Sequence, residues 1–341
     1  MSFINSIMKE MFPAFIGGIV GLVVSVIFDD GIRNLKRNIV RKYKRLFSEK
    51  NDFKSHLFTI GDTSTSFYVI DGDGQSEFNP ENIECRVIDD RVDLPTEIES
   101  IKQEIADEEA MKEKQGLQHK WNGPLYGLAK YRHGRTTDVE GMSVLFNFFK
   151  TDYFTFMASN MQLKRKLMSG ETIGEAYIPH NQLEKVQPIL ANGFGVALVI
   201  ITSDENIILT QRTFNTGPRG SEMDISVVEG VHPLLDRHSQ NNGPDLYHAA
   251  IRGANEELGL IIDKDRVKFL GYGIDLDFYQ WNMIGFAHVP QTAKEIQELR
   301  SRGTSGKWEN TLLLFKNFTT KEVADLIINE KIWSTGKVAL Y

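Results

Sequence analysis

The sequence predicts one membrane-spanning helix near the N-terminus, then an α+β region, then a C-terminal half in which strands and helices alternate. Three observations predict this fold class. Residues 11–28 carry no charged side chain, residues 53–93 alternate short strand-type runs with glycine and aspartate turns, and α/β alternation begins at residue 193. A hydrophobic share of 41% with 25% charged residues is typical of globular proteins and excludes wholesale disorder. The single cysteine, Cys85, excludes an intrachain disulfide and fits a reducing compartment.

The apolar segment 11–28, MFPAFIGGIVGLVVSVIF, is long enough to cross a bilayer. At a rise of 1.5 Å per residue such a helix spans about 27 Å, close to the ~30 Å hydrocarbon core. A cleaved secretory signal is the alternative, but the apolar core is too long for one and no A-x-A cleavage site follows. We therefore expect residues 1–30 to form a transmembrane anchor.

A basic juxtamembrane segment follows the anchor. Residues 31–50 contain eight Lys and Arg side chains against one acidic residue, Glu49. This asymmetry predicts that the N-terminus lies outside and that the rest of the chain is cytoplasmic. The segment is expected to lie against anionic membrane lipid, or else to form a solvated helix whose only role is to set the topology.

Small side chains recur every four residues inside the anchor, at Gly17, Gly21 and Ser25. Such a face allows two membrane helices to pack closely and would support a homo-oligomer. The alternative is that glycine is simply frequent in membrane helices.

The charge of the chain is unevenly distributed. The net charge of −7 combines +7 over residues 31–50 and −2 over residues 1–30, which leaves −12 for residues 51–341. A region this acidic is a poor non-specific binder of nucleic acid, so we expect no DNA or RNA partner. A small nucleotide held by a few local contacts remains compatible with this charge.

The region after the anchor divides into a β-rich and helical part, 51–164, and a C-terminal domain, 165–341. The first part contains an aromatic segment, 121–158, whose rings could stack on nucleobases or pack in a core. Just inside it, Arg132 and Arg135 could meet phosphates or remain solvated. From the periodicity, helices are expected at 94–105, 249–258, 292–301 and 319–330, and C-terminal strands at 193–201, 207–213, 225–230, 268–274, 281–289 and 311–315.

The stretch AAIRGANEELGL, residues 249–260, has the spacing of a metal-binding helix. Positions 253, 256 and 257 fall at i, i+3 and i+4 and share one helix face, so the side chains of Glu256 and Glu257 can converge on Mg²⁺, whereas Gly253 has none to offer. Arg252 lies four residues before Glu256 and can pair with it, and Gly259 suits the left-handed turn that ends such a helix.

This stretch resembles the Nudix box, whose pattern ends in R-E-U-x-E-E-x-G-U, where U is aliphatic. The matching residues are Arg252, Ala254, Glu256, Glu257, Gly259 and Leu260. The resemblance implies a Nudix-like α/β/α domain with a mixed sheet over residues 165–341. It also implies Mg²⁺ on Glu256 and Glu257, with Glu257 catalytic if the domain is a hydrolase.

Two carboxylates of the family pattern are missing. Gly253 stands in place of the glutamate that follows the arginine, and Pro244 in place of the upstream glutamate, with Asp245 one position late. The glycine before the box, Gly230, is displaced by an insertion of eight residues. The acidic residues that could compensate are Glu229, Asp236 and Asp245. Since metal-assisted attack needs several carboxylates, these departures favour nucleotide recognition over hydrolysis.

A nucleotide in the Nudix-like cleft would need cationic and aromatic contacts. The candidates for phosphate are Arg212 and Arg219, and those for a base are Tyr272, Tyr279 and Trp281. For each of them, core packing or a solvated loop is the alternative.

A membrane helix joined to a Nudix-like domain resembles the TM–Nudix effectors of cyclic-oligonucleotide-based antiphage systems (CBASS). The resemblance implies that the domain senses a cyclic oligonucleotide made by a CD-NTase. It further implies that the protein then damages the bacterial inner membrane and kills the host cell. A membrane-anchored Nudix hydrolase of nucleoside diphosphate derivatives and a membrane-surface scaffold remain the alternatives.

Overall fold

The computed structural model describes residues 57–89, 92–135, 141–179, 181–212, 222–238, 243–301 and 310–341. The predicted anchor and the basic segment, with Gly17, Gly21 and Ser25, lie outside these ranges. Among the helices in the described ranges, none combines the length and apolarity needed to cross a membrane. The anchor therefore stays a prediction.

The described residues from Leu57 onward belong to one compact unit built around a mixed sheet. Its strands run in the order β13 (Asn310–Asn317), β8 (Asn206–Arg212), β7 (Phe194–Ile201), β12 (Gln280–His288), β11 (Val267–Asp275) and β3 (Phe67–Asp71), with β10 (Val227–Gly230) on β7 and β9 (Met223–Ile225) on β8. β7 and β12 are parallel, and the other neighbours are antiparallel. The predicted mixed sheet is confirmed.

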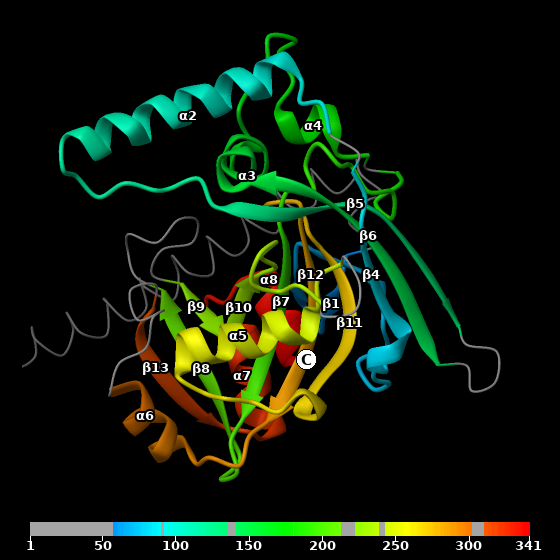
Figure 1. The fold of residues 1–341 in the computed structure, drawn as a ribbon. Helices are drawn as coiled ribbons and strands as arrows, with labels where there is room; N and C mark the ends of the chain where they lie inside the picture. The colour runs from blue at the N-terminus through cyan, green and yellow to red at the C-terminus, as the bar shows by residue number, and fades with distance from the viewer. Residues whose placement is uncertain are drawn as a thin grey trace, which may run out of the picture. The chain divides into compact units, whose positions relative to one another are not determined.

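Helices cover both faces of this sheet (Figure 1). They are α5 (Leu246–Leu258), α6 (Ala293–Ser301), α7 (Thr320–Asn329) and α8 (Ser334–Leu340). α5 packs on β10 and β7, and α8 packs on β7 and β12. Because β7 is covered on both faces, all eight of its residues are buried, as in the central strand of an α/β sandwich.

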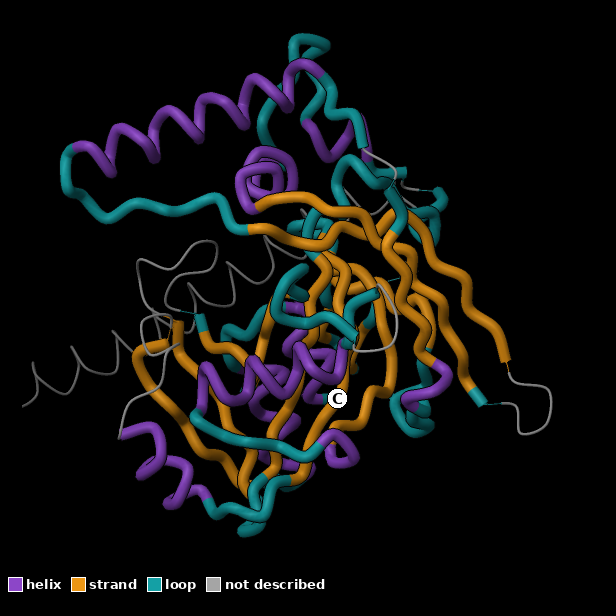
Figure 2. The backbone as a smooth tube through the Cα atoms, in the orientation of Figure 1, coloured by secondary structure: helices purple, strands orange, loops and turns teal. Residues whose placement is uncertain are grey.

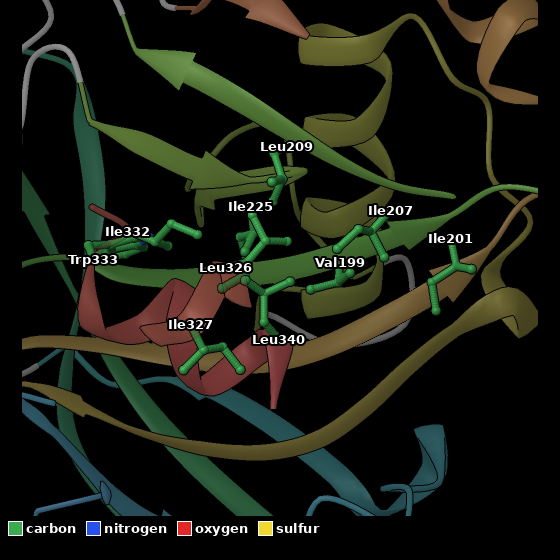
Figure 3. Packing of buried hydrophobic residues seen from close by; sticks show 11 residues of the cluster. Val199, Ile201, Ile207, Leu209, Ile225, Leu326, Ile327, Ile332, Trp333 and Leu340 are labelled. Atoms are coloured by element: carbon green, nitrogen blue, oxygen red, sulfur yellow. The ribbon is translucent and has the colours of Figure 1, made fainter. Parts of the chain in front are cut away.

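A cluster of buried apolar side chains lies beneath α7 and α8 (Figure 3). Val199 and Ile201 of β7 meet Leu326 and Ile327 of α7 and Leu340 of α8. These side chains alternate along β7 because successive residues of a strand point to opposite faces. This layer fixes one face of the sheet and leaves α5 to cover the other.

The N-terminal part of the unit adds a second, three-stranded sheet (Figure 2). Its order is β4 (Ile83–Val87), β6 (Met142–Asp152) and β5 (Pro124–Arg135), and it is accompanied by α2 (Thr96–Lys114), α3 (Tyr153–Ser159), α4 (Ile173–Tyr177) and the short ribbon of β1 (Thr59–Ile60) and β2 (Thr63–Ser64). β3 from this part is an edge strand of the large sheet, paired with β11. The boundary expected between residues 164 and 165 therefore falls inside one compact unit.

Most aromatic side chains of the segment 121–158 are buried, although Trp121 is 70% exposed. Phe146 and Phe148 are fully buried, and the ring of Phe146 meets that of Phe194 at 5.1 Å. Of the two alternatives for this segment, core packing is the one that the structure shows for these rings.

The box helix α5 has a defined start and end. Asp245 caps its N-terminus by accepting hydrogen bonds from the backbone N–H groups of Tyr247 (3.0 Å) and His248 (3.2 Å). Gly259 ends it in the left-handed conformation, with φ of 73°. The predicted role of Gly259 is confirmed, whereas Asp245, a candidate to compensate for a missing carboxylate, caps the helix and pairs with Lys264 at 2.8 Å.

Gly259→Ala is expected to lower the free energy of unfolding by about 1–2 kcal/mol, because a side chain disfavours left-handed backbone. Urea unfolding of the two proteins measures the difference. Asn255→Ala, an exposed position in the same helix, serves as the control and should leave stability equal or higher. Equal stability of the Gly259→Ala variant and the wild type would contradict the left-handed conformation assigned to Gly259.

Candidate functional site

Arg252 is the centre of the box. Its Nε and Nη2 donate to the two carboxylate oxygens of Asp236 at 2.8 Å each, and Nη2 also donates to the carbonyl oxygen of Gly230 at 2.9 Å. Nη1 lies 3.0 Å from Glu229 Oε1 and 3.2 Å from Glu256 Oε2. The predicted pairing of Arg252 with Glu256 is confirmed as one contact among several.

This ion-pair network is largely shielded from solvent. The side chain of Arg252 is 11% exposed, and that of Asp236 is 0% exposed. Burial opposes the charge of Arg252, but hydrogen bonds to Asp236 and the charges of Glu229 and Glu256 outweigh it and raise the pKa of Arg252. The network ties β10, the 231–238 loop and α5 together.

Gly253 lies where the helix approaches β10 most closely. A Cβ atom at this position would lie 2.7 Å from Val227 Cγ1 and 2.8 Å from Glu229 Cβ. Real Cβ atoms essentially never approach other heavy atoms this closely. The position at which the box normally has a glutamate therefore has no room for a side chain in this packing.

Both glutamates of the box are engaged by protein groups. Glu256 pairs with Arg252, and the buried Glu257 accepts a hydrogen bond from the backbone N–H of Val228 at 3.2 Å through Oε1. Arg300 of α6 is also buried; burial lowers its pKa, and the negative charge of Glu257 opposes that shift. The predicted pair of metal ligands thus has a cation beside each carboxylate.

The resemblance implies Mg²⁺ here, and the residues do not fit it. Gly253 supplies no ligand and leaves no space for one, and Glu256 and Glu257 already have protein partners. The acids that could have compensated are also engaged, because Glu229 and Asp236 bind Arg252. Within the described part of the chain, no group of three or more His, Cys, Asp or Glu side chains is arranged to hold a metal ion. We therefore derive no metal-dependent step.

The side chains predicted to contact a base lie inside the protein. Tyr279 and Trp281 are 0% exposed and Tyr272 is 1% exposed. Tyr279 donates from its hydroxyl to the carbonyl of Lys185 at 3.3 Å, so its polar end is also used. In this conformation none of the three presents a free ring face, which corrects their expected role as stacking platforms.

One of the two predicted phosphate ligands, Arg212, has an ion-pair partner on a neighbouring strand. Arg212, at the end of β8, lies 3.5 Å from Asp224 Oδ2 of β9, so it is partly neutralised. Arg219 lies outside the described residues. Arg212 is not among the contacts found around Arg252.

An apolar cavity of about 390 Å³ lies on the α7–α8 side of the sheet. Val199, Ile201 and Leu340 line it, together with Phe58 and Phe67 from the N-terminal part of the unit. The described residues that line it include no lysine or arginine, so a polyanionic nucleotide would lose hydration there without gaining a cationic partner. This cavity does not serve the predicted ligand.

His232, beside the network, should make stability depend on pH. Its Nδ1 accepts from the backbone N–H groups of Leu234 and Leu235, both at 3.2 Å, so the folded state holds the neutral ring. Burial and then the charge of Arg252 lower the pKa of His232, while Asp236 and Glu256 act in the opposite direction. A lowered pKa contributes stability that is present above about pH 6.5, the unfolded value, and is lost as the pH falls through the folded value.

We expect the free energy of unfolding to decrease below about pH 6.5, and to decrease less in His232→Gln. Urea unfolding of both proteins between pH 7.5 and pH 5 measures the two slopes. His288→Gln, on an exposed position of β12, is the control and should keep the wild-type slope. If the free energy of unfolding of wild type and of His232→Gln changes equally with pH, His232 is not the source of the pH dependence.

Comparison with known proteins identifies no family for this chain. No protein-family model and no curated protein matches it. Among solved structures it is similar to the protein DR0079 of Deinococcus radiodurans (15% identity, TM-score 0.30, covering 43% of this chain and 79% of that one). It is also similar to a MutT protein from Methanosarcina mazei Go1 (11% identity, TM-score 0.29, covering 43% and 89%).

A third similar structure is a MutT/nudix family protein from Enterococcus faecalis (12% identity, TM-score 0.26, covering 37% of this chain and 43% of that one). Structural neighbours of this chain thus include proteins with MutT and Nudix names. Because the TM-scores are this low, the proposals below rest on the chain's own residues.

Proposed function

We propose that the C-terminal domain recognises a nucleotide without hydrolysing it through a metal-dependent step. The observation that carries this proposal is the ion-pair network of Arg252. It keeps the box helix on the sheet by using Asp236, Glu229 and Glu256, the acids that a metal site would need. Gly253 removes a further ligand from the same helix face.

We further propose that the protein is a CBASS effector that senses a cyclic oligonucleotide made by a CD-NTase. Three features of the sequence support this: the box-like stretch 249–260, the apolar segment 11–28 and the basic run 31–50. In this proposal the segment 11–28 spans the bacterial inner membrane with the C-terminal domain in the cytoplasm. Ligand binding favours assembly of several copies, whose Gly17, Gly21 and Ser25 faces then pack in the bilayer. Membrane damage and host cell death follow.

Binding and cleavage are measured on the purified full-length chain with Mg²⁺ present. The probes are cyclic di-AMP, cyclic di-GMP, cyclic GMP–AMP and cyclic tri-AMP on one side, and ADP-ribose and other nucleoside diphosphate derivatives on the other. We expect binding of a cyclic probe by calorimetry and no loss of that probe by chromatography.

Two other outcomes would contradict the proposal. Turnover of a nucleoside diphosphate derivative that disappears in Glu257→Gln would establish the membrane-anchored hydrolase. Failure to bind any probe would leave the membrane-surface scaffold. A CD-NTase gene beside the gene of this protein would support the CBASS assignment independently.

A further inference from the structure

A depression of about 480 Å³ lies between strand β5 and the segment 184–186. Its polar lining consists of Lys130, Arg132, His133, Lys185 and one acid, Glu184. We propose that this depression, and not the box, binds the phosphates of the nucleotide ligand. The inference rests on the proposed function and specifies where on the protein the ligand is held.

Three cations of this depression have no ion-pair partner among the residues that the structure describes. Arg135, on the same strand, donates to both oxygens of Asp71 at 2.8 and 2.9 Å, and Arg165 pairs with Glu104 at 2.8 Å. By contrast, Lys130, Arg132 and Lys185 form no ion pair with any residue that the structure describes. Unpaired cations gathered in an acidic protein concentrate positive potential where a phosphate can neutralise it.

The strand geometry places two of these cations for a joint contact. The pairing of β5 with β6 shifts register between Leu128 and Lys130. The β-bulge at Ala129 changes the direction in which the side chains of the following residues point. Lys130 and Arg132 are two positions apart and point to the same side, with Cα atoms about 7 Å apart. Both side chains are exposed. This spacing suits two phosphate groups that are separated within one ligand.

The segment 184–186, which lines the depression beside β5, is held by two tyrosine hydroxyls. Tyr131 donates from its hydroxyl to the carbonyl of Glu184 at 2.8 Å, and Tyr279 donates to the carbonyl of Lys185 at 3.3 Å. The ring of Tyr131 meets the ring of Trp281 at 5.4 Å. These aromatic residues therefore fix the segment 184–186 before a ligand binds, which reduces the entropy that the protein loses on binding. This gives Tyr279 and Trp281 a supporting role in place of the predicted stacking role.

Glu184 is the acid that opposes an anionic ligand here. Burial, and after it the negative charge of Glu184, raises the pKa of the Tyr131 phenol to about 12, so this carboxylate acts electrostatically within the depression. An exposed carboxylate beside the phosphates weakens their binding, so Glu184→Gln should bind the ligand more tightly than the wild type. If the cations served only solubility, Glu184→Gln would not change the affinity for the ligand.

The test compares Kd values of the full-length chain for cyclic di-AMP, cyclic di-GMP, cyclic GMP–AMP and cyclic tri-AMP. The double variant Lys130→Glu/Arg132→Glu should bind the preferred probe at least about tenfold more weakly. The double variant Lys294→Glu/Lys321→Glu carries the same change of net charge on exposed positions of α6 and α7 and should match the wild type. The wild-type affinity should also fall with added KCl, and more steeply than that of the Lys130→Glu/Arg132→Glu variant.

Two results overturn the inference in different ways. If the wild type binds a cyclic probe and Lys130→Glu/Arg132→Glu binds it equally well, the site is elsewhere and the proposed function stands. If the wild type binds none of the probes, the proposed function fails and this site fails with it. Circular dichroism of every variant confirms that the fold is retained.

Discussion

Arg252→Met is expected to lower the free energy of unfolding by about 3–5 kcal/mol, the cost of removing one partner from a buried ion pair. Asp236 is 0% exposed and would lose both of its contacts with the guanidinium. The carbonyl of Gly230 and the carboxylates of Glu229 and Glu256 would lose theirs as well. Methionine keeps most of the packing volume, so the loss reports the polar contacts. Chemical denaturation with urea measures it.

Arg266→Met is the matched control for this substitution. Arg266 lies 3.6 Å from Asp263, and both side chains are largely exposed, so its removal should cost less than about 1 kcal/mol. The loss of stability in Arg252→Lys should lie between those of Arg252→Met and Arg266→Met, because an ammonium group cannot make all the hydrogen bonds that the planar guanidinium makes. A similar small loss for Arg252→Met and Arg266→Met would mean that the network does not hold the box helix in place.

Gly253→Glu, which restores the glutamate of the box, is expected to destabilise the protein and to produce no hydrolysis. In an open helix, replacing glycine usually gains about 0.5–1 kcal/mol. Here the added Cβ would lie 2.7 Å from Val227 and 2.8 Å from Glu229. Overpacking of this kind typically costs about 1–3 kcal/mol. Thermal and urea unfolding, together with a cleavage assay on nucleoside diphosphate derivatives, give the result.

Asn255→Glu provides the comparison. It adds the same charge to the same helix at an exposed position, so it should change stability by less than about 0.5 kcal/mol. If Gly253→Glu is as stable as Asn255→Glu and hydrolyses a substrate, the close packing of α5 on β10 is not what excludes a metal ligand.

The sequence predicts the local structure of the box well, because the signals for it are local. The helix spacing, the pairing of Arg252 with Glu256 and the left-handed turn at Gly259 all depend on residues within one or two helical turns. The strands of the large sheet also follow the predicted ranges closely, since apolar runs of this length between turns are typical of buried strands. The short helix α8, by contrast, has no pattern that marks it.

The partners of the box could not be predicted from spacing. Arg300 lies 43 residues after Glu257, and the close approach of Gly253 to Val227 depends on how a helix rests on a strand. The same holds for Tyr279 and Trp281, whose composition suits both a core and a binding surface. Tertiary packing decides between these alternatives.

We infer that protein groups, and not a metal ion, hold the carboxylates of the box. Mn²⁺ binding to the wild type and to Glu257→Gln, followed by electron paramagnetic resonance, tests it most directly, because glutamine keeps the acceptor oxygen for the Val228 N–H and removes the charge. We predict that the two proteins bind the same number of Mn²⁺ ions with the same affinity. A Mn²⁺ site that is present in the wild type and lost in Glu257→Gln would contradict the claim.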